Sequence, residues 1–191
     1  MLNKPFFKNL KKDYDRRSSE RRQIISAANT VLHDSKRVIF ALHRGDINAA
    51  KKSLADIETT LKKLDKQFSY SRLIQEGAYN AGVEEYVEAK LFCNVISGEK
   101  IDGIKGVTLS TDAYLGGISD LTGELVRLAT NEAAKGNFAE VEKLKTIVAD
   151  VLAELVEFDI TGYLRTKYDQ AKTNLRKIEQ ISYEVKLRSL K

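Results

Sequence analysis

The chain has 191 residues, of which 42% are hydrophobic and 31% are charged, and it contains a single proline. This balance excludes a disordered chain and is typical of one folded domain, so we expect residues 1–191 to form a single domain with its own core. No apolar run approaches the roughly 20 residues that a membrane-spanning helix needs, so no membrane partner is expected. The formal net charge of +5 is compatible with a polyanionic partner such as a nucleic acid.

The single cysteine, Cys93, lies in an apolar run and cannot form an intrachain disulfide. We therefore expect it to be a small buried side chain in a protein from a reducing compartment. The apolar patch at residues 1–7 is too short to be a secretory signal. Together these features predict a cytoplasmic protein.

Apolar residues recur at helical spacing along nearly the whole chain, and no segment supports a β-sheet. The sequence therefore predicts an all-α fold of six or seven helices. Several of these helices are long and amphipathic on two faces, which favours assembly into an oligomer. The predicted helices cover about residues 7–44, 47–68, 71–96, 111–136, 139–158 and 163–190.

Turn signals and glycines divide these helices. Gly45 ends the first helix, and Asp46 is expected to cap the second. The third helix contains two internal glycines, which indicate a bend or a close helix contact. In the fourth helix, further glycines would let another backbone approach closely. These internal glycines are Gly77, Gly82, Gly116, Gly117 and Gly123.

Basic residues of the first helix are candidates for contacts with nucleic-acid phosphates. A solvated helix face is the simpler interpretation of the block between residues 16 and 22, because acidic residues are interspersed with it. The candidate strand-contacting residues are Arg16, Arg17, Arg21, Arg22, Lys36, Arg37 and Arg44.

Two pairs of acidic residues have the spacing that places both members on one side of a helix. Glu85 and Glu88 are three residues apart, and Asp120 and Glu124 are four apart. The first pair falls on a stripe that is otherwise apolar, and carboxylates that face a core are costly unless their charge is compensated. A divalent cation held by both pairs would compensate it.

Four carboxylates suit a hard cation, Mg²⁺ or Mn²⁺, which prefers oxygen ligands. Such an ion polarises a phosphoryl group and lowers the pKa of a bound water, as phosphodiester hydrolysis requires. The pattern alone leaves a second interpretation open, in which these are surface acids and Glu124 pairs with Arg127.

The sequence lacks the residue patterns of other common cofactor sites. A carboxylate-bridged di-iron site needs Glu-x-x-His twice, and neither His33 nor His43 has an acid three residues before it. We expect both histidines to border a polar surface. There is no Cys/His cluster for zinc, no P-loop and no dinucleotide-binding fingerprint.

Several segments resemble the translin family, and most of all its factor X branch. The most specific are Glu-Tyr-Val-Glu-Ala at 85–89 and the run at 114–127, which contains Asp-Leu-Thr-Gly-Glu-Leu. The resemblance extends over nearly the whole chain. The other similar segments are residues 34–44, 167–170, 177–179 and 185–188.

The resemblance implies an all-α bundle that assembles into a closed hollow oligomer and binds single-stranded RNA or DNA. The factor X branch supplies a Mg²⁺-dependent endoribonuclease, and its acidic cluster matches Glu85, Glu88, Asp120 and Glu124. Because the non-catalytic translin branch lacks the full set, the resemblance places this chain on the nuclease side. We expect an archaeal-type homo-oligomer, hexamer to octamer, that cleaves single-stranded RNA with Mg²⁺ or Mn²⁺.

Two other functions remain open from the sequence. The first is a shell that binds single-stranded RNA or single-stranded DNA without cutting it. The second is a structural scaffold for a partner protein, which would show no salt-sensitive binding to nucleic acid.

Overall fold

The computed structural model describes residues 1–189 of the chain and places seven α-helices in that range, without a β-strand. The predicted all-α fold is confirmed, and the periodic apolar residues of each helix form its buried face. The helices are α1 (Lys4–His43), α2 (Ile47–Gln67), α3 (Tyr70–Leu73), α4 (Gly77–Ile96), α5 (Thr111–Lys135), α6 (Phe138–Leu155) and α7 (Gly162–Ser189).

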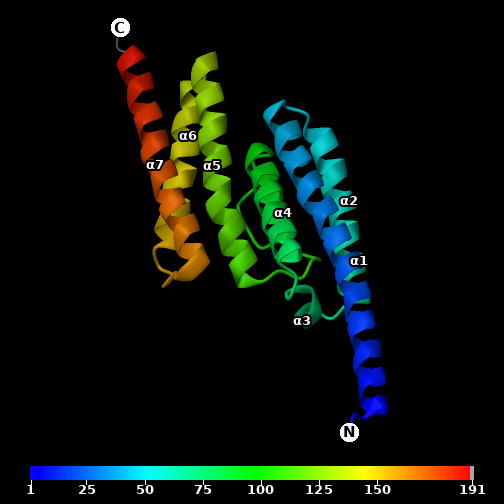
Figure 1. Ribbon diagram of the computed structural model, residues 1–191. Helices are drawn as coiled ribbons and strands as arrows, with labels where there is room; N and C mark the ends of the chain where they lie inside the picture. Colours follow the sequence, from blue (N-terminus) through cyan, green and yellow to red (C-terminus); the bar gives the residue numbers. More distant parts are fainter. Residues whose placement is uncertain (190–191) are drawn as a thin grey trace.

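The long helices form two groups of three that meet across one helix pair (Figure 1). Helices α1, α2 and α4 pack against one another, and so do α5, α6 and α7. The two groups are joined by the packing of α4 against α5, which stand side by side in the middle of Figure 1. Residues at this central pair are therefore within reach of both halves of the chain.

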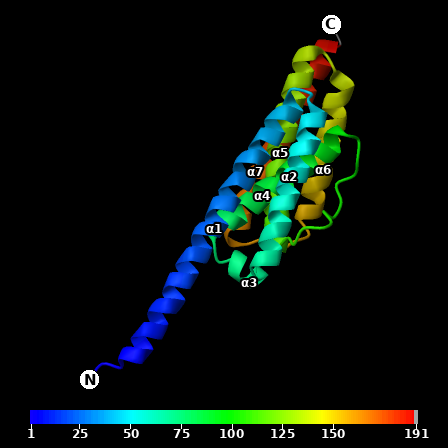
Figure 2. The same ribbon diagram turned by 90° about the vertical axis from the view of Figure 1, so that its right-hand side faces the viewer.

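The N-terminal part of α1 extends beyond the rest of the bundle (Figure 2). The first buried residue of α1 is Ile24, although the helix begins at Lys4. Large apolar side chains on the extended part are exposed instead of packed. They are Phe6, Phe7 and Leu10, together with Tyr14, and Leu2, which precedes the helix, is exposed as well.

The predicted helix boundaries are largely confirmed. Gly45 adopts a left-handed conformation with φ of 79° after α1, and the side chain of Asp46 accepts a hydrogen bond from the amide of Ala49 at 3.1 Å. Residues 97–109 form a loop, as expected. Helix α6 ends at Leu155, three residues before its predicted end, and the predicted end of the last helix at residue 190 lies outside the described residues.

The predicted helix over residues 71–96 is wrong in its first part. The chain forms the short α3, breaks, and begins α4 at Gly77, so this glycine starts a helix instead of interrupting one. Glu76 has an extended backbone at the break, where its carboxylate binds Arg72 at 2.9 Å and Arg21 at 3.4 Å. These ion pairs, with the Asn80 side-chain amide donating to the carbonyl of Ile74, stabilise the break.

Two glycines set how closely α4 approaches its neighbours α1 and α5. A Cβ atom on Gly82 of α4 would lie 2.8 Å from the carbonyl oxygen of Ala28 in α1. A Cβ atom on Gly117 of α5 would lie 2.6 Å from the side chain of Val87 and 2.9 Å from the carbonyl oxygen of Glu84, both in α4. The predicted close approach is confirmed at these positions, because no larger residue fits between the helices.

Gly116 and Gly123 of α5 have different surroundings from each other. Gly116 also faces α4, where it leaves room for the side chain of Glu84. A Cβ atom on Gly123 would lie 3.5 Å from the side-chain amide nitrogen of Asn174, which is an ordinary contact distance. A close backbone approach is therefore not the role of Gly123.

Among residues 1–189, no helix combines the length and the apolar character that crossing a bilayer requires.

Gly117→Ala is expected to push α4 and α5 apart and to lower the free energy of unfolding by about 1–3 kcal/mol, because the added methyl group overlaps Val87. Gly77→Ala is the matched control, since no atom lies within 4 Å of its Cβ position. Thermal or urea unfolding measures both. Equal stability of Gly117→Ala and the unchanged protein would contradict this packing.

Glu142 of α6 links this helix to α7. Its carboxylate binds Lys145 at 2.6 Å, accepts a hydrogen bond from Ser182, and binds Lys186 at 3.2 Å. The hydrogen bond from Lys145, then that from Ser182, lowers the pKa of Glu142 from its ordinary value of 4.5 to about 2.

Because this pKa is lower in the folded state, Glu142 stabilises the fold above about pH 4.5, and the contribution is lost as the pH falls towards 2. Glu142→Gln should remove that part of the pH dependence. The carboxylate is partly exposed, so screening keeps the effect near 1 kcal/mol, or about 2–4 °C in melting temperature at pH 7. Melting curves of both proteins between pH 2.5 and 7 test this, and parallel curves would refute it.

Candidate functional site

The acidic residues predicted to act together lie on the two helices at the centre of the fold. Glu85 and Glu88 belong to α4, and Asp120 and Glu124 belong to the adjoining α5. Their charges act on one another, because Glu85, Asp120 and Glu124 each raise the pKa of Glu88. The four carboxylates named from the sequence therefore lie near enough to interact electrostatically across α4 and α5, and we call them the carboxylate cluster.

Glu88 is the most enclosed member of the carboxylate cluster. It is 8% exposed, and within residues 1–189 its carboxyl group has neither a hydrogen bond nor an ion pair. Burial, followed by the charges of Glu85, Asp120 and Glu124, raises the pKa of Glu88 to about 9. A buried carboxyl group surrounded by three others is costly to ionise unless a cation joins it.

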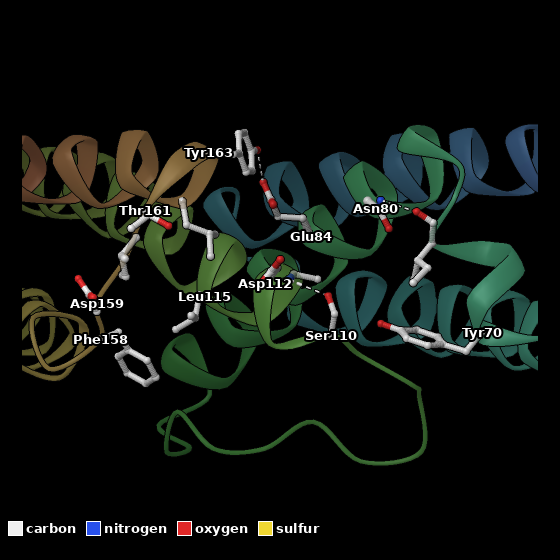
Figure 3. A pocket seen from close by; sticks show the side chains of 14 residues that line it. Tyr70, Asn80, Glu84, Ser110, Asp112, Leu115, Phe158, Asp159, Thr161 and Tyr163 are labelled. Carbon is white, nitrogen blue, oxygen red and sulfur yellow. Dashed lines mark hydrogen bonds between the residues drawn. The ribbon is translucent and has the colours of Figure 1, made fainter.

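Lys167 of α7 binds the edge of the carboxylate cluster. Its ammonium group contacts Asp120 and lies 2.7 Å from the carboxylate of Glu84, which precedes the cluster on α4. Tyr163, one turn earlier on α7, donates its hydroxyl to Glu84 at 2.8 Å (Figure 3). Burial lowers the pKa of Lys167, but the hydrogen bonds to Asp120 and Glu84 outweigh it and hold the pKa above its usual value.

Two further cationic side chains approach from α1 and α5. Lys36 of α1 lies 3.9 Å from the carboxylate of Glu85, and Arg127 of α5 lies 3.5 Å from that of Glu124. The predicted pairing of Glu124 with Arg127 is thus present, together with the clustering of the acids. Burial is the largest cause that raises the pKa of Glu85, and Lys36 partly opposes it.

The burial of His43 shows that one prediction was wrong. We expected it to border a polar surface, but its side chain is 5% exposed and Nε2 donates a hydrogen bond to the carboxylate of Glu124. Its ring lies 4.9 Å from that of Phe92 in α4. The last turn of α1 therefore supplies a buried polar group to the site. His33, by contrast, is exposed beside Asp34.

The donor set has the chemistry of a site for a hard cation, since it consists of carboxylate oxygens around a buried, unpaired Glu88. In the described part of the chain, however, no three His, Cys, Asp or Glu side chains converge closely enough to hold one ion. Asp120 is paired instead with the ammonium group of Lys167, which also binds Glu84.

Of the basic residues predicted to contact a strand, Lys36 lies at the carboxylate cluster. Arg22 lies fourteen residues before it on α1, which places the block at 16–22 at least about 20 Å away along the helix. Much of that block is engaged locally: Arg16 pairs with Asp13 at 3.6 Å, and Arg22 donates to Ser18 at 3.0 Å.

The remaining basic candidates lie elsewhere on or near α1. Arg21 binds Glu76, and the carbonyl of Arg17 accepts a hydrogen bond from Arg72. Two others lie further along. Arg37 pairs with Asp34 at 3.8 Å, and Arg44 follows the end of α1. Their contact with a nucleic acid stays a prediction.

Three residues of the site could not be named from spacing: Lys167, Tyr163 and His43. They come from helices far from α4 and α5 in sequence, so no local pattern connects them to the acids. One signal was present. Glu84, Glu85 and Glu88 crowd three negative charges into five residues, which calls for a basic neighbour, and Lys167 is that neighbour for Glu84.

Comparison with known proteins places these residues in a family context. The sequence profile of the translin family matches residues 19–189. An uncharacterized protein of Methanocaldococcus jannaschii is 26% identical over 166 residues, which cover 84% of this chain and 74% of that protein. Translin-associated protein X of Pongo abelii is 26% identical over an alignment of 228 residues, covering 95% of this chain and 78% of that protein.

Solved structures have the same fold. The crystal structure of apo-NeC3PO matches with a TM-score of 0.85 at 24% identity, covering 97% of this chain and 98% of that one. The structure of AfC3PO in complex with duplex RNA matches with a TM-score of 0.87 at 23% identity, covering 96% and 98%. At these identities the likeness establishes the fold, and it confirms the predicted type of helical bundle.

Lys167→Met is expected to lower the free energy of unfolding by about 2 kcal/mol, because it leaves Asp120 and Glu84 without their shared cation in a largely enclosed site. Lys172→Met is the matched control. It removes an ammonium group from the same helix, where Lys172 pairs with the exposed Asp169. Urea unfolding of both variants without divalent cations measures the difference, and an equal loss in both would refute the special role of Lys167.

Proposed function

Because the chain belongs to the translin family, we propose that it is an endoribonuclease that cleaves single-stranded RNA with the help of Mg²⁺ or Mn²⁺. The observation that carries this proposal is the gathering of Glu85, Asp120 and Glu124 around the buried, unpaired carboxyl group of Glu88. The presence of duplex RNA in a complex of AfC3PO, a protein with the same fold, supports a nucleic acid as the ligand.

In this proposal the four carboxylates would hold the cation where α4 packs against α5. The cation, when bound, supplies the positive charge that polarises the scissile phosphate and lowers the pKa of a water. A carboxylate oxygen of the cluster would accept a proton from the attacking water as the water oxygen bonds to phosphorus. The bond to the ribose oxygen would break, and that oxygen would leave with a proton taken from solvent. Lys167, already at Asp120, is placed to neutralise charge at the same edge.

Charge around the carboxylate cluster also suggests how a strand is held. Lys36 and Arg127 are cationic, reach the cluster and remain about half exposed, so both can meet a phosphate group. Arg37, beside Lys36, and the block at 16–22 would extend the contact along α1. Single-stranded DNA carries the same phosphates and is a second ligand of this surface.

The chain is proposed to work as a closed, hollow homo-oligomer, hexamer to octamer. The exposed apolar side chains on the extended part of α1 support assembly, because a second subunit would remove them from water. Phe6, Phe7 and Leu10 are among them.

A shell that binds RNA without cutting it is the alternative function. The contacts already present favour it, since Lys167 pairs with Asp120, Arg127 pairs with Glu124, and His43 donates a hydrogen bond to Glu124. The two functions differ in whether a product forms.

Asp120→Asn is expected to reduce cleavage at least 100-fold, because it removes one charged ligand of the proposed cation while preserving the size of the side chain. A labelled single-stranded RNA incubated with Mg²⁺, Mn²⁺ or EDTA measures this. The unchanged protein should cut with either cation and should not cut in EDTA.

Asp150→Asn, an exposed acid on α6, is the control for a change of net charge. Light scattering and RNA binding in EDTA establish that Asp120→Asn still assembles and binds. Equal cleavage by Asp120→Asn and Asp150→Asn would remove the carboxylate cluster from the mechanism, and binding without a product under every cation would favour the non-cleaving shell.

A further inference from the structure

A pocket opens beside the carboxylate cluster, at the end of the bundle where α5 and α7 begin (Figure 3). Its volume is about 660 Å³, within the roughly 300–1,000 Å³ range of small-molecule sites. Glu84 connects the two: it lines the pocket and shares Lys167 with Asp120 of the cluster. The ammonium group of Lys167 therefore bridges a residue of the pocket wall and a residue of the carboxylate cluster.

The lining of the pocket is aromatic and apolar on its walls. Tyr70, Phe158 and Tyr163 contribute rings, with Leu115 between them. Phe158 is 48% exposed and Tyr163 is 63% exposed, so both keep ring surface that a planar ligand could cover. Stacking on an aromatic side chain is the common way in which proteins hold an unpaired nucleobase.

The charge of the pocket selects against phosphate. Glu84, Asp112 and Asp159 supply carboxylates, and the described lining includes no Lys, Arg or His. The side-chain carboxylates of Asp112 and Asp159 have no hydrogen bond or ion pair within residues 1–189, so both can accept hydrogen bonds from a ligand. In Figure 3, Asp112 lies near the middle of the pocket, between Glu84 and Ser110.

From these features we propose that the pocket receives the nucleobase that flanks the scissile phosphodiester of an RNA strand, an inference that rests on the proposed cleavage activity. The phosphate remains at the carboxylate cluster, while the base turns into the pocket and stacks on Phe158 or Tyr163. The unpaired carboxylates favour bases with an exocyclic amino group, namely adenine, cytosine and guanine, over uracil. The chain would then cut with a base preference on one side of the bond.

Binding is tested separately from cleavage, in EDTA, with short single-stranded RNAs that carry 2-aminopurine at one position. The chain contains no tryptophan, so the probe fluorescence is read without interference. Phe158→Ala is expected to weaken quenching of the probe and RNA affinity about tenfold through lost stacking. Tyr183→Ala is the matched control, because Tyr183 is 62% exposed on α7 but does not line the pocket.

Cleavage is tested with a pool of random-sequence RNA and mapping of every cut site. We expect cuts to be about ten times more frequent where one flanking position holds adenine, cytosine or guanine than where it holds uracil. Asp112→Asn should bring this ratio to within about twofold, because an amide presents one acceptor oxygen where the carboxylate presents two. Leu115→Trp, which places a ring inside the pocket, should also lower the ratio.

The outcomes separate the two proposals. The proposal of base binding in the pocket is overturned if the protein cuts without a base preference, or if Asp112→Asn and Phe158→Ala leave the preference unchanged. Either result leaves the proposed nuclease activity standing. Probe binding that depends on Phe158, without any cutting, supports the pocket and overturns the nuclease. If the protein neither binds the probe nor cuts RNA, both proposals are overturned.

Discussion

The close approach of α4 and α5 at Gly117 is the constraint on which the site depends. With no side chain at Gly117, the backbone of α5 reaches Val87 and the carbonyl of Glu84. At this separation the carboxylates that follow on each helix, Glu88 on α4 and Asp120 on α5, influence one another directly. A wider spacing would leave two unrelated acidic patches, because electrostatic coupling falls with distance and with access of water.

The close approach of α4 and α5 also places carboxylates near one another, and groups from other helices compensate their repulsion. Negative charges gather where solvent is limited, and cationic or hydrogen-bonding groups reach them from other helices: Lys36 and His43 from α1 and Lys167 from α7. Both three-helix groups thus contribute to one site across their shared boundary. Glu88 alone among the four acids has no such partner in the described residues, so the cation that we propose would bind beside it.

The pocket extends this arrangement towards the substrate. Lys167 connects Asp120, in the cluster, to Glu84, in the pocket wall, because its ammonium group binds both carboxylates. The first half of the chain provides Tyr70 and Glu84, and the second half provides Phe158 and Tyr163. A substrate that spans the cluster and the pocket would therefore contact both halves of the bundle.

The sequence alone determined the all-α fold and most helix boundaries, through helical periodicity and turn glycines. It also determined the candidate acids, through the spacing of Glu85 with Glu88 and of Asp120 with Glu124. These features depend only on neighbours within one or two helical turns. The break before Gly77 escaped prediction, since long-range pairs such as Arg21 with Glu76 stabilise it. The tertiary structure alone decided that His43 is buried against Glu124 and that Lys167 joins Asp120 to Glu84. Those contacts join residues that are 47 to 83 positions apart, and no local pattern encodes which faces of distant helices will meet.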